Sequence, residues 1–319
     1  MNNVEGLSAK ELATLLDGMK TSFIHGNNAM AFARDYFNRL GKPNLDNSPL
    51  ATVIAYELQA GSYTSEVMRN PSKRELWCKQ VASYVKRFLP EKGSILEVGV
   101  GEASTLAGVL NILRDRGVKA LGFDLSWSRL FVANKWLAAN DVSAELFLAD
   151  ITNIPLSDNS IDVVYSAHSL EPNGGQEQLA ITECFRVARR AVVFIEPIYE
   201  LATPEARSRM DSHGYIRNLH EVAKSLGGSV VDYRLLDFTF NPLNPSGVLS
   251  ILKSSKNHEH SYAAANYRKS WVCPLTKSGL VKRQGFFYSK PNCIAYPIFK
   301  GIPLLHPDHA VFAHLLEHD

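Results

Sequence analysis

The sequence has few cysteines, no long apolar run and almost no net charge. Its four cysteines, Cys78, Cys184, Cys273 and Cys293, are scattered and include no C-x-x-C pair, which argues against a disulfide framework and an intact zinc site. No run approaches the roughly 18 consecutive apolar residues of a membrane-spanning helix. The first residues lack the basic and apolar regions of a secretory signal, so we expect a cytoplasmic protein without membrane contact.

Composition otherwise indicates an ordinary globular protein. Apolar residues make up 45% of the 319 positions and charged residues 21%, which is enough for a large core. The net charge of +2 is unevenly spread, because residues 251–290 hold eight Lys and Arg against one acid, Glu259. That segment fits either a solvated surface or contact with a nucleic acid or an anionic carrier.

The most informative stretch is residues 95–106, where a buried-strand pattern enters a glycine-rich turn that opens a helix. Gly99 and Gly101 leave the backbone bare for a ligand, and the first helical turn offers unpaired N–H groups. A dinucleotide site favours a third glycine, but Ser104 stands there. Glu97 repels phosphate and attracts a cation, so a ligand with an ammonium and a sulfonium group fits this turn better.

Acidic residues also follow the next two predicted strands. Apolar runs and helical patterns alternate from residue 94 onward, which predicts a parallel sheet with crossover helices. We expect strands at 95–98, 120–123, 144–148, 161–164 and 191–195, then at 229–240 and 248–253. Asp124 can accept both hydrogen bonds of a ribose diol. Asp150 can accept from an adenine amine, and Ile151 offers a backbone N–H and an apolar face.

These strand ends together resemble the motifs of the class I S-adenosylmethionine (SAM)-dependent methyltransferases over residues 90–253. The resemblance implies an α/β fold with a doubly wound, mostly parallel, seven-stranded Rossmann-like sheet, whose last two strands form an antiparallel pair. It implies SAM as cofactor. The implied contacts are Glu97, Gly99 and Gly101 for the methionine portion, Asp124 for the ribose, and Asp150 and Ile151 for the adenine, with Leu125 as a further cofactor contact.

Residues 1–90 read mostly as helix, with a capped run after Ser8 and further helical patterns at 29–40 and 74–89. In the family that it resembles, such a segment commonly covers the active site, so we expect a cap; a dimerisation arm is the alternative. Similar segments with a tyrosine lie against SAM in small-molecule members. Tyr63 and Gln59 are therefore candidates for closing the site.

Acceptor-side candidates follow the fourth and fifth strands. His168 titrates near neutrality and is the first candidate for a general base, although it could merely pack beside the cofactor. Glu196, at the end of the fifth strand, is the second candidate. Glu171 and a later polar stretch could contact the acceptor, with an arginine clamping a carboxylate or phosphate, or this stretch could be an exposed helix. The substrate-binding candidates are Glu171, Tyr199, Arg207, Arg209, His213 and Tyr215.

The last 50 residues carry a second resemblance. The phrases Trp-Val-Cys-Pro-Leu-Thr at 271–276 and Tyr-Pro-Ile-Phe-Lys-Gly-Ile-Pro at 296–303 resemble the small zinc-ribbon-like partner proteins of tRNA, rRNA and protein methyltransferases. Thr276 replaces their second cysteine, and tetrahedral zinc normally needs four ligands, so we expect no metal. The expected module, at 269–319 after a linker at 254–268, would dock or cover the site.

The sequence thus predicts a methyltransferase with a cap (1–90), a SAM-binding domain (91–253) and a small β-rich module. The favoured acceptor is a small polar metabolite or natural-product intermediate, methylated on oxygen or nitrogen, and a homodimer is possible. The runner-up acceptor is RNA, suggested by the basic segment and by the ribbon resemblance. A third possibility is a SAM-binding partner subunit without catalysis.

Overall fold

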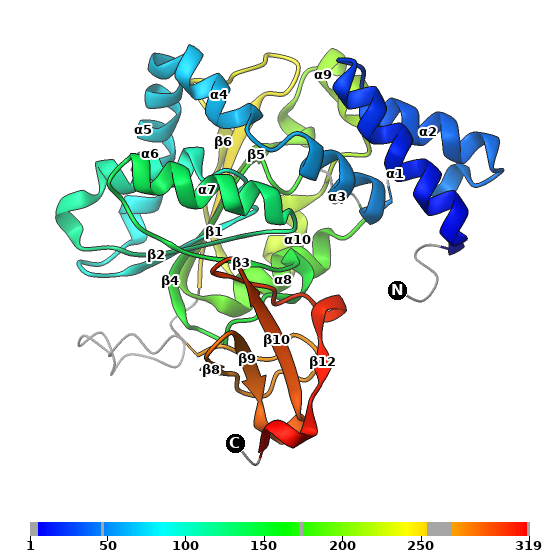
Figure 1. The fold of residues 1–319 in the computed structure, drawn as a ribbon. Coiled ribbons are helices and arrows are strands. Elements are labelled where there is room, and N and C mark those ends of the chain that lie inside the picture. The colour runs from blue at the N-terminus through cyan, green and yellow to red at the C-terminus, as the bar shows by residue number, and fades with distance from the viewer. Residues whose placement is uncertain (1–5, 46–47, 172–174, 254–269, 318–319) are drawn as a thin grey trace.

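A seven-stranded sheet forms the centre of the protein in a computed structural model, which describes residues 6–45, 48–171, 175–253 and 270–317 (Figure 1). The strand order is β3-β2-β1-β4-β5-β7-β6. Strands β1 to β5 pair in parallel, whereas β7 is antiparallel to both β5 and β6. The strands are β1 (Ser94–Val98), β2 (Lys119–Asp124), β3 (Glu145–Leu148), β4 (Ile161–Ala167), β5 (Ala188–Pro197), β6 (Ser229–Leu235) and β7 (Ser246–Leu252). The predicted α/β fold class is confirmed.

Helices cover both faces of the sheet, as the predicted alternation requires. Alternating side chains of each strand enter two separate cores, so that Leu96 and Val98 face one layer while Ile95 faces the other. The first core includes residues of α8 (Glu177–Val187) and α10 (Leu219–Ser225). The second includes residues of α5 (Pro71–Phe88), α6 (Ser104–Ile112) and α7 (Trp127–Ala139). Helix α5 therefore packs against the sheet, although the expected boundary at residue 90 assigned it to the cap.

The other N-terminal helices form a layer of their own. They are α1 (Ala9–Ile24), α2 (Ala29–Arg39), α3 (Pro49–Leu58) and α4 (Ser62–Arg69). Ser8 and Glu11 cap α1 reciprocally through side chain and backbone, which stabilises the helix start that the sequence predicts. A small core around Leu15, Met19 and Phe37 joins the first three helices.

Two predicted boundaries differ from the structure. The helix that the sequence predicts after the glycine-rich turn, from Ala103 to Arg116, ends as α-helix at Ile112 and continues as a short 3₁₀ turn before Gly117, whose φ of +61° closes it. The last antiparallel strands were expected at 229–240 and 248–253, but β6 already ends at Leu235. Residues 236–240 leave the sheet and carry Phe240 to the wall of a cavity described below.

The C-terminal module is a separate small sheet beside β3 (Figure 1). Its strands are β8 (Val281–Arg283), β9 (Phe286–Ser289), β10 (Ile294–Phe299), β11 (Ile302–Pro303) and β12 (Val311–Phe312). Leu305 donates its N–H to the carbonyl of Leu148 in β3 (2.8 Å), and Trp271 packs edge-on against Phe147 (4.9 Å). The module therefore extends the β3 edge of the main sheet. The expected linker, 254–268, lies outside the described residues.

Candidate cofactor and acceptor site

A cavity of about 530 Å³ lies at the carboxyl end of β1 and β4, beneath α4 and α5. Ligands of doubly wound folds bind at this edge of the sheet. Its lining combines the glycine-rich turn with side chains from α4, α5, α9 (Pro204–Ser212) and the loop between β6 and β7. Of the predicted site residues, the lining includes Tyr63, Glu97, Gly99, Gly101, His168, Glu171, Arg209 and Tyr215.

The glycine-rich turn has the bare backbone that the sequence predicts. Gly99 and Gly101 both adopt left-handed backbone angles, with φ of +62° and +53°. A Cβ on Gly99 would lie 2.3 Å from Cβ of Ser169, whereas a Cβ on Gly101 would meet only an Arg129 nitrogen at 4.0 Å. Gly99 is therefore required for packing, and Gly101 leaves open space at the cavity wall.

Glu97 lies on the floor of this cavity and is 3% exposed. Tyr165 on β4 donates its hydroxyl hydrogen to the Glu97 carboxyl at 2.7 Å. Burial raises the pKa of Glu97 to about 8, and the hydrogen bond from Tyr165 and the charge of Arg74 offset only part of that rise. The carboxyl is therefore mostly protonated at neutral pH until a cation arrives.

Arg74 of α5 is a site residue that the sequence reasoning missed. Its Nη1 donates to Thr105 Oγ1 at 3.2 Å, and its guanidinium lies over the Phe240 ring at 5.0 Å. Its Nε is buried without a hydrogen-bond partner, although it lines the cavity beside Glu97. A buried donor without a partner is costly, so this atom is placed to bind an anionic group of a ligand. In the sequence, Arg74 was recognisable only as the first residue of the helical pattern at 74–89.

The nucleoside half of the predicted site lies outside this cavity. Asp124 is 7% exposed and accepts hydrogen bonds from the backbone N–H groups of Gly101 and Ser126, both at 2.9 Å. Asp150 accepts from the backbone N–H and the hydroxyl of Thr152. Leu125 is half-buried and Ile151 is buried. The three strand ends are thus adjacent in the sheet, and Glu57 of α3 accepts the Ser128 N–H just after β2.

Arg129, at the start of α7, connects that half to the cap. Its guanidinium lies over the rings of Tyr56 (4.2 Å) and Tyr63 (4.9 Å), and it donates to Gln59 Oε1 at 3.4 Å. Arg129 is also the strongest charge acting on Asp124, whose pKa is nevertheless raised because burial dominates. Tyr63 and Gln59 therefore lie beside the glycine-rich turn, where both contact Arg129.

Glu102 fixes the cap to the glycine-rich turn, another contact that the sequence reasoning missed. It is 1% exposed, and its carboxylate accepts the backbone N–H groups of Gly61, Tyr63 and Thr64. It also accepts the Thr64 hydroxyl at 2.8 Å. These donors form the first turn of α4, where a carboxylate is favoured by the unpaired N–H groups and the helix dipole. One turn residue thus anchors the start of α4 over the cavity.

Replacing Glu102 with glutamine should loosen α4 without unfolding the sheet. The amide keeps one acceptor oxygen but turns NH₂ hydrogens toward the N–H donors, so about 1–3 kcal/mol of local stabilisation is lost. Amide hydrogen exchange at Gly61, Tyr63 and Thr64 should accelerate at least about tenfold. The control is Glu75→Gln, which removes an exposed ion pair with Lys79 on α5. Equal exchange rates at these amides in both variants would contradict the anchoring role.

His168 occupies the end of β4 with a φ of +59°. Its Nδ1 contacts the Glu171 carboxylate, and its Nε2 lies 2.7 Å from Ser246 Oγ. Thr239 Oγ1 donates toward two backbone carbonyls, accepts the Ser246 N–H and lies 3.2 Å from Ser246 Oγ. Burial alone would lower the pKa of His168, but the Glu171 carboxylate outweighs it and raises the pKa, so the imidazolium form is stabilised.

Glu171 is the cavity carboxylate that pairs with His168. It accepts from Asn244 Nδ2 at 3.2 Å, and Tyr215 also hydrogen-bonds to it. Burial would raise its pKa, but His168 and these hydrogen bonds lower the pKa below its usual value. Glu171 is therefore ionised across the neutral range.

Glu196 lies behind the cavity wall and does not line it. It is 1% exposed, and its Oε1 accepts the backbone N–H of Ser169 at 3.0 Å, while Oε2 is buried without a partner. Burial raises the pKa of Glu196 to about 7. The position suits a group that holds the His168–Ser169 turn.

The polar stretch at 199–215 divides into residues inside and outside the cavity. Arg209 and Tyr215 line it. Arg207 instead donates to the backbone carbonyls of Tyr199 (3.0 Å) and Glu200 (2.7 Å). Tyr199 lies under the guanidinium of Arg217 at 4.4 Å, and His213 is exposed with Nδ1 against the Arg209 carbonyl. The structure thus brings two of the later candidates together with His168 and Glu171.

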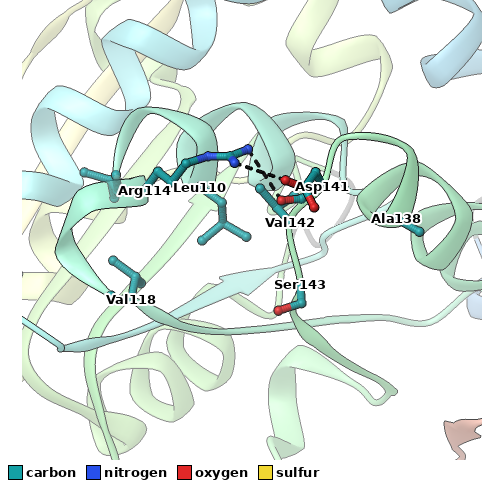
Figure 2. A pocket seen from close by; sticks show the side chains of 9 residues that line it. Leu110, Arg114, Val118, Ala138, Asp141, Val142 and Ser143 are labelled. Carbon is teal, nitrogen blue, oxygen red and sulfur yellow. Dashed lines mark hydrogen bonds and ion pairs between the residues drawn. The ribbon is translucent and has the colours of Figure 1, made fainter.

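A second cavity of about 400 Å³ lies at the opposite end of β2 and β3 (Figure 2). Figure 2 shows Arg114 reaching across it to Asp141, at 3.1 Å, above Val118 and Leu110. Both charged side chains are largely exposed. The lining has no glycine-rich turn and no buried titratable group, so the chemistry belongs to the first cavity.

Comparison with known proteins defines the class. Residues 95–191 match the family model described as a methyltransferase domain, and this range includes the glycine-rich turn, Asp124, Asp150 and His168. No curated protein matches the chain. Residues 95–191 are therefore similar to methyltransferase domains.

Similar solved structures have low sequence identity. A putative sarcosine dimethylglycine methyltransferase from Galdieria sulphuraria is 14% identical, with a TM-score of 0.45 over 56% of this chain and 85% of that chain. The magnesium protoporphyrin IX methyltransferase of Synechocystis is 14% identical, with a TM-score of 0.45 over 70% and 99%. A Haloferax volcanii complex of the Trm112 activator with a putative methyltransferase gives 15% identity and 0.45 over 61% and 96%.

Within the part of the chain that the structure describes, no helix has the length and apolar character to cross a membrane. Likewise, no cluster of three or more histidine, cysteine, aspartate or glutamate side chains with metal-binding geometry occurs among the described residues.

Proposed function

We propose that the protein methylates a small polar metabolite or natural-product intermediate on oxygen or nitrogen, with SAM as the methyl donor. The observation that carries this proposal is the single cavity that joins the glycine-rich turn to His168, Glu171 and Tyr215. Its volume of about 530 Å³ falls within the range of small-molecule sites. Helices α4 and α5 form its cover, which suits an acceptor that enters completely.

The residues present fit the proposed cofactor. Glu97 offers a buried carboxyl to an ammonium or sulfonium group, and the unpartnered Nε of Arg74 offers a donor to a carboxylate. Gly99 and Gly101 leave the backbone bare beside them. Asp124 with Leu125, and Asp150 with Ile151, are proposed for the ribose and the adenine. When bound, SAM supplies a methyl group already activated by its sulfonium.

The protein must then hold the acceptor atom in line with the methyl group and accept the proton that the acceptor loses. We assign proton uptake to Glu171, which stays ionised because the charged His168 lies against it. His168 acts as the cationic partner in this assignment, and Glu196 positions the turn that carries it. Trp77 and Phe240 line the cavity with apolar rings and help to exclude water.

A His168→Gln variant tests the charged pair through stability at different pH values. Removing one partner should cost about 3 kcal/mol of unfolding free energy at pH 6. Because the folded-state pKa of His168 is raised, its contribution is complete below its unfolded value of about 6.5 and disappears as pH rises through the folded-state value. Denaturant unfolding of both proteins at several pH values measures this. A difference that stays constant up to pH 10 would show that His168 is neutral.

The C-terminal module is proposed to be a ribbon-like unit that has replaced its metal site with hydrogen bonds. Thr276 Oγ1 and Ser278 Oγ both donate to Asn292 Oδ1, at 2.8 and 2.7 Å, near Cys273. Cys273 itself contacts the Tyr296 hydroxyl at 3.3 Å. Asn153 beside the proposed adenine loop donates to the Pro274 carbonyl at 2.7 Å. The module would therefore brace that loop.

Transfer of labelled methyl groups from SAM into fractionated extract tests the proposed function. We expect the label in a small-molecule fraction. Label appearing only in RNA, with binding to total tRNA that falls steeply as salt rises, would favour the runner-up instead. Bound SAM that is never converted to S-adenosylhomocysteine would favour the non-catalytic partner subunit.

A further inference from the structure

We propose that the acceptor is an anion and that Arg209 binds its carboxylate or phosphate group. This inference rests on the proposed methyl transfer and adds the chemical class of the acceptor. It follows from the charges that line the cavity: the carboxylates already have partners, whereas the cations Lys73, Arg74 and Arg209 have no carboxylate partner among the described residues.

Each buried carboxylate at the cavity has its hydrogen bonds within the chain. Glu97 accepts from Tyr165 and is mostly protonated at neutral pH. Glu102 accepts four hydrogen bonds from the start of α4. Glu171 is paired with His168. Glu66, at the exposed rim, contacts Arg69 and Asn70. The floor of the cavity therefore presents little unbalanced negative charge to an acceptor.

The basic side chains of the same cavity are unbalanced. Among the described residues, no carboxylate lies within ion-pair distance of Lys73, Arg74 or Arg209, which all line the cavity. Arg74 lies next to Glu97 and Thr105, at the proposed methionine end, and is assigned to the single carboxylate of the cofactor. Arg209 lies at the opposite end of the cavity, where the proposed acceptor binds. Its unpaired charge would be balanced by a second anionic group, carried by the acceptor.

Arg209 differs from the neighbouring arginines in having no competing partner for its charge. Arg207 donates to two backbone carbonyls, and Arg217 pairs with Asp211. Among the described residues, the Arg209 guanidinium has polar and ring contacts with Tyr215 alone, to the hydroxyl at 3.5 Å and the ring at 5.7 Å. Burial raises the pKa of Tyr215 to about 12, so the phenol stays neutral beside an anion. The guanidinium fork matches a carboxylate or phosphate in shape and charge.

The location sets the distance between the bound anion and the reacting group. Tyr215 hydrogen-bonds to Glu171, which contacts His168, so Arg209 is separated from the proposed proton acceptor by one tyrosine side chain. The apolar walls between these groups and Arg74 are Trp77 and Phe240, whose ring centroids lie 5.3 Å apart. The acceptor would thus carry its anionic group at one end and an apolar or aromatic body along these rings.

The experiment separates a small-molecule extract on an anion exchanger at neutral pH before the assay. Retained and unretained fractions are incubated with the full-length protein and methyl-labelled SAM. The acceptor should be in the retained fraction, and phosphatase treatment of that fraction distinguishes a phosphate from a carboxylate. With that fraction, Arg209→Gln should raise the apparent KM about 10- to 100-fold, the loss of a charge-assisted hydrogen bond, while binding of S-adenosylhomocysteine is unchanged.

Two variants serve as comparisons. Arg209→Lys keeps the charge but not the fork and should recover part of the lost affinity. Arg217→Gln removes the same charge from an exposed arginine outside the cavity and should leave the KM unchanged. An acceptor found only in the unretained fraction, or an Arg209→Gln enzyme with wild-type KM, would overturn the inference. Absence of methyl transfer in every fraction would count against the proposed function itself.

Discussion

Replacing Gly99 with alanine should weaken SAM binding by more than about 100-fold. An L-residue at a φ of +62° costs roughly 1–2 kcal/mol, and the added Cβ would lie 2.3 Å from Cβ of Ser169. Ser169 cannot simply move away, because its hydroxyl donates to the Val98 carbonyl at 2.7 Å and its N–H donates to Glu196. The turn itself must shift, and overpacking of this kind costs a further 1–3 kcal/mol or so. Equilibrium titration with SAM measures the loss.

Comparison with Gly101→Ala distinguishes the cost of a positive φ from the cost of the steric clash that an alanine at position 99 would make with Ser169. Its φ of +53° is equally unfavourable for alanine, but its new Cβ would meet only one Arg129 nitrogen, at 4.0 Å. The unfolding free energy should fall by about 1 kcal/mol for Gly101→Ala and by at least twice as much for Gly99→Ala. Adding Ser169→Gly should recover part of the stability lost in Gly99→Ala. Equal destabilisation by both single variants would disprove the packing role of Gly99.

The second large effect concerns Glu97, which should release a proton when SAM binds. Its pKa of about 8 means that the carboxyl is mostly protonated at pH 7. An ammonium or sulfonium group beside it favours the ionised form, so SAM affinity should rise with pH and level off above pH 8 or so. Calorimetric titration at pH 7 in two buffers of different ionisation enthalpy counts the released protons. Glu97→Gln should abolish the release and weaken binding about 10- to 100-fold.

Tyr165→Phe provides the matched control for this assignment. The Tyr165 hydroxyl lowers the pKa of Glu97 from the value that burial alone would give, so its removal should move the proton release to higher pH. The glutamate remains, and SAM affinity at pH 9 should change little. Proton release that persists in Glu97→Gln would assign the titrating group elsewhere, for example to Glu196, whose pKa is about 7.

The sheet was predictable from the sequence because its signals are local. Short apolar runs, the Gly99 and Gly101 turn and Asp124 each occupy a few consecutive positions, and parallel strand ends must meet at one edge. The structure confirms the resulting seven-stranded fold. The length of β6 was overestimated, because an apolar pattern alone does not show that residues 236–240 turn toward α5.

The contacts that complete the site could not be predicted in the same way. Glu102 bonds to Gly61 and Thr64 about 40 positions earlier, and Arg74 bonds to Thr105 31 positions later. Nothing in a single sequence indicates which helix side chains meet the turn after folding. The different roles of Arg207 and Arg209 also depend on tertiary structure. Arg207 donates to the backbone carbonyl of Tyr199, whereas Arg209 lines the cavity.

The central claim is that the turn after β1 selects SAM through its carboxyl and its bare backbone. Equilibrium titration of the purified protein with SAM, S-adenosylhomocysteine and NAD compares the two ligand classes directly. We expect saturable binding of SAM and S-adenosylhomocysteine, weakened by Glu97→Gln, and no binding of NAD. Saturable binding of NAD without any binding of SAM or S-adenosylhomocysteine would contradict the account.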